Sequence, residues 1–278
     1  EDLRSRGKSV EYYLASSVPK SIDCVAIGKD AEELGEIVKC RHWFNPVQIR
    51  NRWTYCSEKW DYLLDSFLLN PEPRFFLDKD VLEVGCWEGA LGAQALAAGA
   101  RSGHFTDSPL RDLDWRFPYP AFNLETPDYE RTVGENIGSL PLVLANRDSA
   151  RVKFSRANVY TVSHDVDAVY DVTIFGGILY HLYDPMLAIR EICKVSREKV
   201  VLGTWLIGGR EPLAYLQMPL ESDSYDTTTW FYLSIPMLQL LFEHNGFPRS
   251  AVLGGNVGTL LEADRSRVEY RYLIFSRN

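Results

Sequence analysis

The chain has 278 residues, of which 46% are hydrophobic and 24% charged, a composition typical of a soluble globular protein with a sizeable core. The formal net charge of −8 at pH 7 disfavours binding to nucleic acid through phosphates, because that mode needs clustered lysine and arginine. No apolar run approaches the roughly 18 residues of a membrane-spanning helix, and no signal peptide is visible.

Residues 1–75 lie outside any alternation of strands and helices, and we expect them to form an N-terminal helical cap. Short amphipathic helices are predicted over 30–39 and 57–69, the second ending at Asn70-Pro71. An aromatic and basic run from His42 to Tyr55 separates them. These aromatic side chains either pack the cap onto the main domain or form a lid over a ligand pocket, and the sequence leaves both readings open.

From residue 80 onward, expected strands alternate with expected helices. The strands are predicted at 81–84, 102–106, 152–154, 171–175, 199–204 and 268–275, and the helices at 88–98, 184–196 and 235–245. This alternation predicts an α/β fold with a mostly parallel sheet and helices on both faces. The main domain is expected over 76–278, with an aromatic-rich insertion at about 108–150 that is long enough to suggest a functional element.

The turn after the first of these strands carries the strongest signal for a ligand site. The apolar strand 81–84 runs into Gly85-Cys86-Trp87-Glu88-Gly89 and then into an alanine-rich helix. Glycines four apart let the backbone approach a ligand closely, and the helix start offers free N–H groups to polar or anionic atoms. Packing alone explains a cysteine at position 86, because the turn needs a small side chain there, so we do not expect Cys86 to be reactive.

Two acidic residues accompany this turn. Asp107 comes 18 residues after Gly89, at the end of the second strand, where a carboxylate can accept hydrogen bonds from both hydroxyls of a ribose. The alternative is a helix cap, because Ser108-Pro109 follows. Glu83 lies within the first strand, so its charge is expected to be buried and to need a partner.

Two segments carry a resemblance to a known family. The glycine turn resembles motif I of the class I S-adenosylmethionine-dependent methyltransferases. Residues 171–185 add Leu179-Tyr180-His181 followed by Pro185, which resembles a Leu-Tyr-His-x-x-x-Pro signature. That signature is found in a branch that includes wobble-uridine tRNA carboxymethyltransferase-like proteins and many small-molecule methyltransferases. The resemblance covers roughly residues 40–205 and is weaker from Trp230 to Phe247.

The resemblance implies S-adenosylmethionine as the cofactor and a Rossmann-like sandwich of seven strands, the last one antiparallel. In such a fold the glycine turn holds the methionine end of the cofactor, with Glu83 near its amino group or in a purely structural role. Asn158 and the backbone N–H of Val159 would meet the adenine, and Gly176 would lie beside the methyl donor. The cofactor residues predicted in this way are Glu83, Gly85, Cys86, Trp87, Gly89, Asp107, Asn158, Val159 and Gly176.

His181 is the candidate catalytic residue. It follows the fourth strand, from which a neutral imidazole can accept a proton from a hydroxyl nucleophile. The alternative is a structural hydrogen-bond hub. Aromatic residues are expected to bind the acceptor, namely Tyr180, Trp205, Tyr225 and Trp230; a core patch or a homodimer contact would explain the same aromatics.

The function predicted from the sequence is methyl transfer from S-adenosylmethionine to an oxygen or nitrogen of a small-molecule acceptor. The alternatives are an enzyme that methylates or carboxymethylates the tRNA wobble uridine, and a non-catalytic cofactor-binding protein. A nicotinamide oxidoreductase is disfavoured because the turn reads Gly-x-x-x-Gly. Neither nucleic acid nor a membrane is expected as a partner.

The five cysteines form no C-x-x-C pair and match no metal-ligand pattern, so no metal is expected. Reduced thiols are typical of a cytoplasmic protein, which is the location we expect.

Overall fold

The computed structural model describes residues 48–49, 52–53, 74–87, 89–108, 151–216, 229–254, 258–260 and 267–277. The helices predicted at 30–39 and 57–69, and nearly all of the predicted insertion, lie outside these residues. Within the predicted cap, β1 (Gln48–Ile49) and β2 (Arg52–Trp53) pair antiparallel in a sheet of their own.

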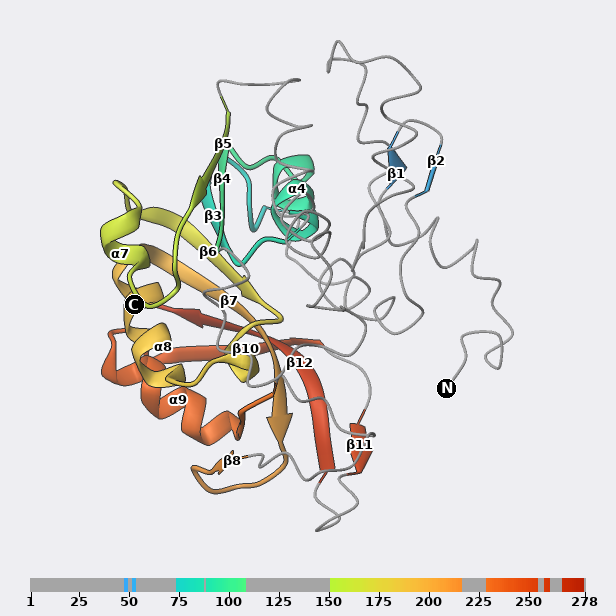
Figure 1. The fold of residues 1–278 in the computed structure, drawn as a ribbon, viewed down its shortest axis with the longest axis vertical. Helices are drawn as coiled ribbons and strands as arrows, with labels where there is room; N and C mark the ends of the chain where they lie inside the picture. The colour runs from blue at the N-terminus through green and yellow to red at the C-terminus, as the bar shows by residue number, and fades with distance from the viewer. Residues whose placement is uncertain are drawn as a thin grey trace, which may run out of the picture.

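The main sheet has ten strands and contains every strand predicted from the sequence, each longer than expected. These strands are β3 (Asp80–Val84), β4 (Ser102–Asp107), β5 (Val152–Arg156), β6 (Tyr170–Gly176), β7 (Ser196–Ile207) and β12 (Arg267–Ser276). With β10 (Arg249–Gly254), they follow the order β10-β12-β7-β6-β3-β4-β5 (Figure 1). Strands β3 to β7 pair in parallel, whereas β12 runs antiparallel to both of its neighbours, which confirms the predicted antiparallel last strand.

Helices cover both faces of the sheet (Figure 1). The three predicted helices are present as α4 (Ala90–Ala97), α8 (Pro185–Lys194) and α9 (Ile235–His244). The short helix α7 (Val162–Asp165) and the 3₁₀ turn η4 (Leu179–His181) were not predicted. In Figure 1, α4 lies on one face, and α7, α8 and α9 lie on the other. No helix in the described part of the chain is long and apolar enough to cross a membrane.

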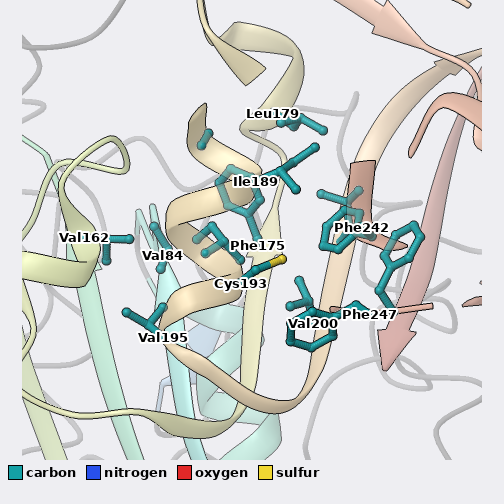
Figure 2. Close-up of a cluster of buried hydrophobic side chains, with 14 of the residues drawn as sticks. Val84, Val162, Phe175, Leu179, Ile189, Cys193, Val195, Val200, Phe242 and Phe247 are labelled. Carbon is teal, nitrogen blue, oxygen red and sulfur yellow. The ribbon is translucent and has the colours of Figure 1, made fainter. Parts of the chain in front are cut away.

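Alternation along the strands divides the core between these two faces. Phe175 and Val200 pack with Ile189 of α8 and Phe242 of α9 (Figure 2). On the other face, a second cluster contains strand residues such as Ile174 together with Leu91 and Ala95 of α4, Phe75, Phe76, and the tyrosines 180, 270 and 272.

A short strand pair extends the sheet beyond the end of β6. Strand β7 pairs with β6 as far as Gly203 and then continues to Ile207. There β9 (Phe231–Leu233) pairs in parallel with β7 through Leu206, and β8 (Ala214–Leu216) pairs antiparallel with β9. Because β12 occupies the other edge of β7, β9 lies on the β6 side. The remaining strand, β11 (Gly258–Leu260), pairs with β12.

Candidate active site at the carboxyl edge of the sheet

The glycine turn joins β3 to α4 and adopts left-handed backbone angles. The φ angles are +66° at Gly85, +47° at Trp87 and +82° at Gly89. A Cβ added at Gly85 would lie 1.8 Å from Cδ1 of Ile178, the residue before η4. Gly85 therefore admits the loop that follows β6, a packing reason that the sequence alone did not reveal; its contact with a cofactor stays a prediction.

Trp87 is a non-glycine residue with positive φ, a conformation that other contacts must hold in place. Its backbone N–H donates to Oδ2 of Asp107 at 2.6 Å, and the backbone N–H of Cys86 donates to the carbonyl of Thr106 at 3.0 Å. The end of β4 thus fixes the turn after β3.

Asp107 is buried at the end of β4, with 7% of its surface exposed. Its other carboxylate oxygen, Oδ1, accepts from the backbone N–H of Ser108 at 2.8 Å. Burial raises the pKa of Asp107 to about 6, although both backbone hydrogen bonds act in the opposite direction. The helix cap that we considered for this carboxylate falls partly on residues outside the described chain. The structure shows that this carboxylate links the end of β4 to the turn that follows β3.

Glu83 is buried in β3, as predicted, and its Oε2 accepts from the backbone N–H of Gly92 in α4 at 2.8 Å. A Cβ at Gly92 would lie 2.6 Å from this oxygen, so the glycine lets the carboxylate reach the helix backbone. This contact is the structural role that the sequence left open.

Ser108 follows Asp107 and was not among the predicted site residues. It is only 9% exposed, and its hydroxyl oxygen has no hydrogen-bond partner among the described residues. Leaving a buried hydroxyl without a partner costs roughly 1–3 kcal/mol, so a ligand group is the natural partner here. Its position directly after the acidic strand end was the one available sequence signal.

The segment after β5 lies beside this strand end, because the N–H of Ala157 donates to the carbonyl of Asp107 at 3.0 Å. Oδ1 of Asn158 accepts from the N–H of Tyr160 at 2.9 Å, so the predicted adenine acceptor also closes a local turn. Val159 packs against the core. The hydroxyl of Tyr160 accepts from the N–H of Asp184 at 3.0 Å, which links this segment to the start of α8.

The loop after β6 contains Gly176, Gly177 and η4. Gly176 lies over Leu91 of α4, since an added Cβ would come within 2.7 Å of that side chain. His181 ends η4 half-buried, with its N–H donating to the carbonyl of Ile178 at 2.8 Å and its ring centroid 4.0 Å from that of Tyr180. The candidate base is thus carried by the loop that contacts Gly85.

Aromatic side chains surround the other side of this loop. Tyr180 is buried, and its carbonyl accepts from the N–H of Trp230 at 2.8 Å. Trp230 packs edge-on against Tyr183, which is 65% exposed. Trp205 packs edge-on against Tyr270 of β12, with 5.6 Å between ring centroids. Tyr225 lies outside the described residues.

Tyr270 and Tyr272 are a second omission from the sequence prediction. They alternate along β12 and face the same side of the sheet as α4. The alternation of side chains in the last apolar strand was visible, but nothing in the sequence indicated which strand it pairs with.

No protein-family model matches the chain, and neither does any curated protein. Solved structures are similar to it. The N-terminal domain of EvdMO1, crystallised in the presence of SAH and D-fucose, aligns with a TM-score of 0.57 and 18% sequence identity, covering 90% of this chain and 98% of that one. The same domain with SAH bound gives the same values.

A structure of EvdMO1 itself aligns with a TM-score of 0.53 and 17% identity, covering 89% of this chain and 48% of that one. This chain therefore corresponds in extent to the N-terminal half of the longer protein. At such identities the likeness shows the fold alone. The strand order, the antiparallel β12 and this likeness together confirm that the chain has the Rossmann-like fold of class I methyltransferases.

Proposed function

We propose that this protein transfers a methyl group from S-adenosylmethionine to an oxygen or nitrogen of a small-molecule acceptor. The observation that carries the proposal is the link between Asp107 and the glycine turn at the carboxyl edge of the sheet. Ligands of open α/β sheets bind at this edge. The similar EvdMO1 domain, which has been solved with SAH bound, supports the choice of cofactor.

The polar groups at this edge fit such a cofactor. Asp107 and the hydroxyl of Ser108, which has no hydrogen-bond partner among the described residues, would hold the ribose, and Glu83 would lie near the amino group of the methionine moiety. Asn158 and Val159 would face the adenine. When bound, S-adenosylmethionine supplies a methyl group on a positively charged sulfur.

The loop after β6 and the aromatic residues near it would hold the acceptor. Tyr180 of η4, Trp205 of β7 and Trp230, the residue before β9, supply aromatic rings that suit a small ring-bearing molecule. His181 would accept the proton that a hydroxyl acceptor loses, whereas a neutral amine would need less help from a base. Tyr225 keeps its predicted role as a further acceptor contact.

Binding of S-adenosylhomocysteine, measured by calorimetry, tests the cofactor half of the proposal. We expect binding by the wild type, no binding of NAD⁺, and an affinity weakened by about 1.5–3 kcal/mol in Asp107→Ala, the range for hydrogen bonds to a charged group. Wild-type protein that binds NAD⁺ instead would contradict the proposal.

Methyl-labelled S-adenosylmethionine tests the acceptor half. Three probes separate the acceptor classes: D-fucose for sugar hydroxyls, catechol for phenols, and total tRNA for nucleic acid. Label transferred to either small molecule supports the proposal. Label transferred to tRNA alone would establish the RNA-modifying alternative, and tight cofactor binding without any transfer would favour a non-catalytic protein.

A further inference from the structure

The loop of residues 177–184 joins β6 to α8 and carries Tyr180 and His181; we call it the acceptor loop. Near its start, the side chain of Ile178 fills the space over Gly85, where an added Cβ would lie 1.8 Å from Cδ1. Gly85 belongs to the glycine turn, which the proposed function assigns to the cofactor. One end of the acceptor loop therefore packs directly on a cofactor segment.

The other end of the acceptor loop is held by the second cofactor segment. Asp184 is the last residue of the loop and the N-cap of α8, where its Oδ1 accepts from the N–H of Leu187 at 2.9 Å. Its own backbone N–H donates to the hydroxyl of Tyr160 at 3.0 Å. Tyr160 follows Asn158 and Val159, the residues assigned to the adenine. This hydrogen bond thus joins the adenine segment to the main chain of the loop, at the point where the loop becomes a helix.

The position of Tyr160 depends on Asn158. Oδ1 of Asn158 accepts from the N–H of Tyr160 at 2.9 Å, and the N–H of Thr161 donates to the carbonyl of Asn158 at 3.0 Å, so the chain forms a tight turn here. The ring of Tyr160 is half-buried and packs against the same core cluster as Ile178. A ligand that engages the carboxamide of Asn158 therefore acts on the turn that places the Tyr160 hydroxyl.

The acceptor loop contains little regular structure of its own. The turn η4 is closed by the N–H of His181 to the carbonyl of Ile178 at 2.8 Å and by the N–H of Leu182 to that of Leu179 at 3.3 Å. Short 3₁₀ turns have poorer hydrogen-bond geometry than α-helices, and segments with few buried contacts and internal bonds open more readily than core elements. The order of this loop therefore depends on the segments that it contacts.

A bound cofactor would bridge the two segments that hold the loop. In the proposed function its methionine end lies at the glycine turn and its adenine at Asn158, so one molecule would restrain both. A ligand that orders part of a protein lowers the cost of binding a second ligand that needs the same order. The hydrogen bond from the N–H of Trp230 to the carbonyl of Tyr180 comes from neither segment, so it holds the loop independently of the cofactor.

We propose that Tyr160 is a positioning residue that couples cofactor binding to the order of the acceptor loop. This inference rests on the proposed function. The Tyr160 hydroxyl carries the effect of the bound adenine to the main chain of Asp184, and so to His181 three residues earlier. The acceptor then binds more tightly once the cofactor is bound, and by linkage the acceptor strengthens cofactor binding by the same factor.

Hydrogen exchange measured by mass spectrometry tests this coupling without knowledge of the acceptor. The backbone amides of His181, Leu182 and Asp184 are hydrogen-bonded, so their exchange reports how often the loop opens. The readout is the factor by which saturating S-adenosylhomocysteine slows exchange within 177–184, with a peptide from α9 as the reference. A purely structural role of Tyr160 would change exchange equally with and without the ligand, and would leave this factor unchanged.

Tyr160→Phe removes the hydroxyl and keeps the ring. Tyr170→Phe is the matched control, since it removes a tyrosine hydroxyl that meets His104 at the opposite end of β6. We expect the ligand to slow exchange in the loop about tenfold in the wild type and in Tyr170→Phe, within the usual range for coupling between two sites. In Tyr160→Phe the slowing should fall to about twofold, because one hydrogen bond corresponds to roughly a fivefold change in an equilibrium. The affinity for S-adenosylhomocysteine should change by no more than about the same factor.

The wild type alone can decide the question, whether or not the variants fold. Wild-type protein that binds S-adenosylhomocysteine without slower exchange in the loop would overturn the inference and leave the proposed function intact. Slowing in Tyr160→Phe equal to that in the wild type, or an equal loss of slowing in Tyr170→Phe, would also refute it. A wild type that binds no S-adenosylhomocysteine would instead overturn the proposed function, and this inference with it.

Discussion

Asp107 experiences two opposing influences. Burial disfavours its charge and raises its pKa to about 6, while the N–H groups of Trp87 and Ser108 favour the carboxylate. At neutral pH the charged form predominates, so the group is ready to accept hydrogen bonds. The Asp107 carboxylate begins to take up a proton just below neutral pH. Its protonation can therefore be measured under conditions that keep most proteins folded.

Cofactor affinity should therefore depend on pH. If the carboxylate holds the ribose, the affinity for S-adenosylhomocysteine should fall as the pH drops below about 6, by up to tenfold per pH unit, because one proton competes with the ligand. Calorimetry between pH 5 and pH 8 measures this. The Asp107→Ala variant should bind weakly with no such step, and a flat wild-type profile would remove the carboxylate from the site.

The stability of the ligand-free protein should change in the opposite direction. The pKa of Asp107 lies above its unfolded value of 3.8, so its contribution to the free energy of unfolding is greatest below about pH 4 and is lost as the pH rises to about 6. The shift corresponds to roughly 3 kcal/mol. Subtracting the Asp107→Ala profile from the wild-type profile in urea titrations isolates this contribution.

Gly85 and Ile178 should show coupled effects on stability. Gly85→Ala places a Cβ against Cδ1 of Ile178 and also strains a left-handed residue, so we expect a loss of about 1–3 kcal/mol. Ile178→Val removes that Cδ1 and should restore part of the loss in the double variant, leaving the backbone strain. Strictly additive losses in urea unfolding would mean that the two residues do not touch.

At the scale of elements, one hydroxyl joins the β8 region to α9. Oγ of Ser234 caps α9 by accepting from the N–H of Met237 at 3.3 Å, accepts from the N–H of Leu213 at 2.9 Å, and donates to the carbonyl of Glu211 at 2.8 Å. The residue is fully buried. It fixes the entry to β8 against the helix that follows β9.

Ser234→Ala should lower the free energy of unfolding by about 1–3 kcal/mol, because it removes a cap and leaves buried backbone groups without a partner. Ser250→Ala is the matched control, since Ser250 is exposed and its hydroxyl bonds only the side chain of Gln239 among the described residues. The control should change stability by less than about 0.5 kcal/mol. Equal effects of both changes in urea unfolding would show that the Ser234 network contributes little.

The turn η4 is held at both ends, by the N–H of His181 to Ile178 and by the N–H of Trp230 to Tyr180. Both hydrogen bonds are made by backbone atoms, so replacing the His181 side chain does not remove either of them. With a hydroxyl acceptor, His181→Ala should lower turnover by about 10²–10⁴-fold, the usual contribution of a general base, at unchanged affinity for S-adenosylhomocysteine. A variant that loses stability or cofactor affinity instead, and retains the wild-type pH–rate profile, would assign His181 a structural role.

At the scale of the whole molecule, His104 joins three strands. Its Nε2 meets the hydroxyl of Ser155 in β5 at 2.7 Å, and its Nδ1 meets the hydroxyl of Tyr170 in β6. Burial, together with Lys153, lowers the pKa of His104 to about 4, with a weaker opposing influence from Asp167. The folded state thus favours the neutral ring at neutral pH.

This ring should contribute to acid unfolding. Because the folded pKa is below the unfolded value of 6.5, its stabilising contribution is complete above about pH 6.5 and is lost as the pH falls through about 4. His104→Phe should be less stable at pH 7 yet lose less stability between pH 6.5 and pH 4. Tyr170→Phe keeps the titrating ring. Its free energy of unfolding, measured by urea titration at each pH, should therefore fall with decreasing pH as steeply as in the wild type. If the free energy of unfolding depended on pH equally in His104→Phe and the wild type, His104 would not contribute to acid unfolding.

The sequence predicted the elements whose signals are local. Strand periodicity and the glycine turn at Gly85 located the parallel sheet and its helices, and the antiparallel last strand came from the family resemblance. It did not predict β8 and β9, because their pairing depends on β7 extending past Gly203, which is a tertiary property. The same holds for the site: Gly85 and Asp107 carry local signals, whereas the approach of Tyr270 to Gly177 follows from strand order.

The position of β12 also has a consequence for biosynthesis. This strand follows both β7 and β10 in the chain but lies between them in the sheet, paired with β7 from Lys199 to Ile207 and with β10 on its other edge. While the ribosome is still making residues 267–276, the backbone groups of β7 and β10 that will pair with β12 have no partner in that strand. We therefore expect the nascent chain to be prone to pairing with other chains until that segment emerges.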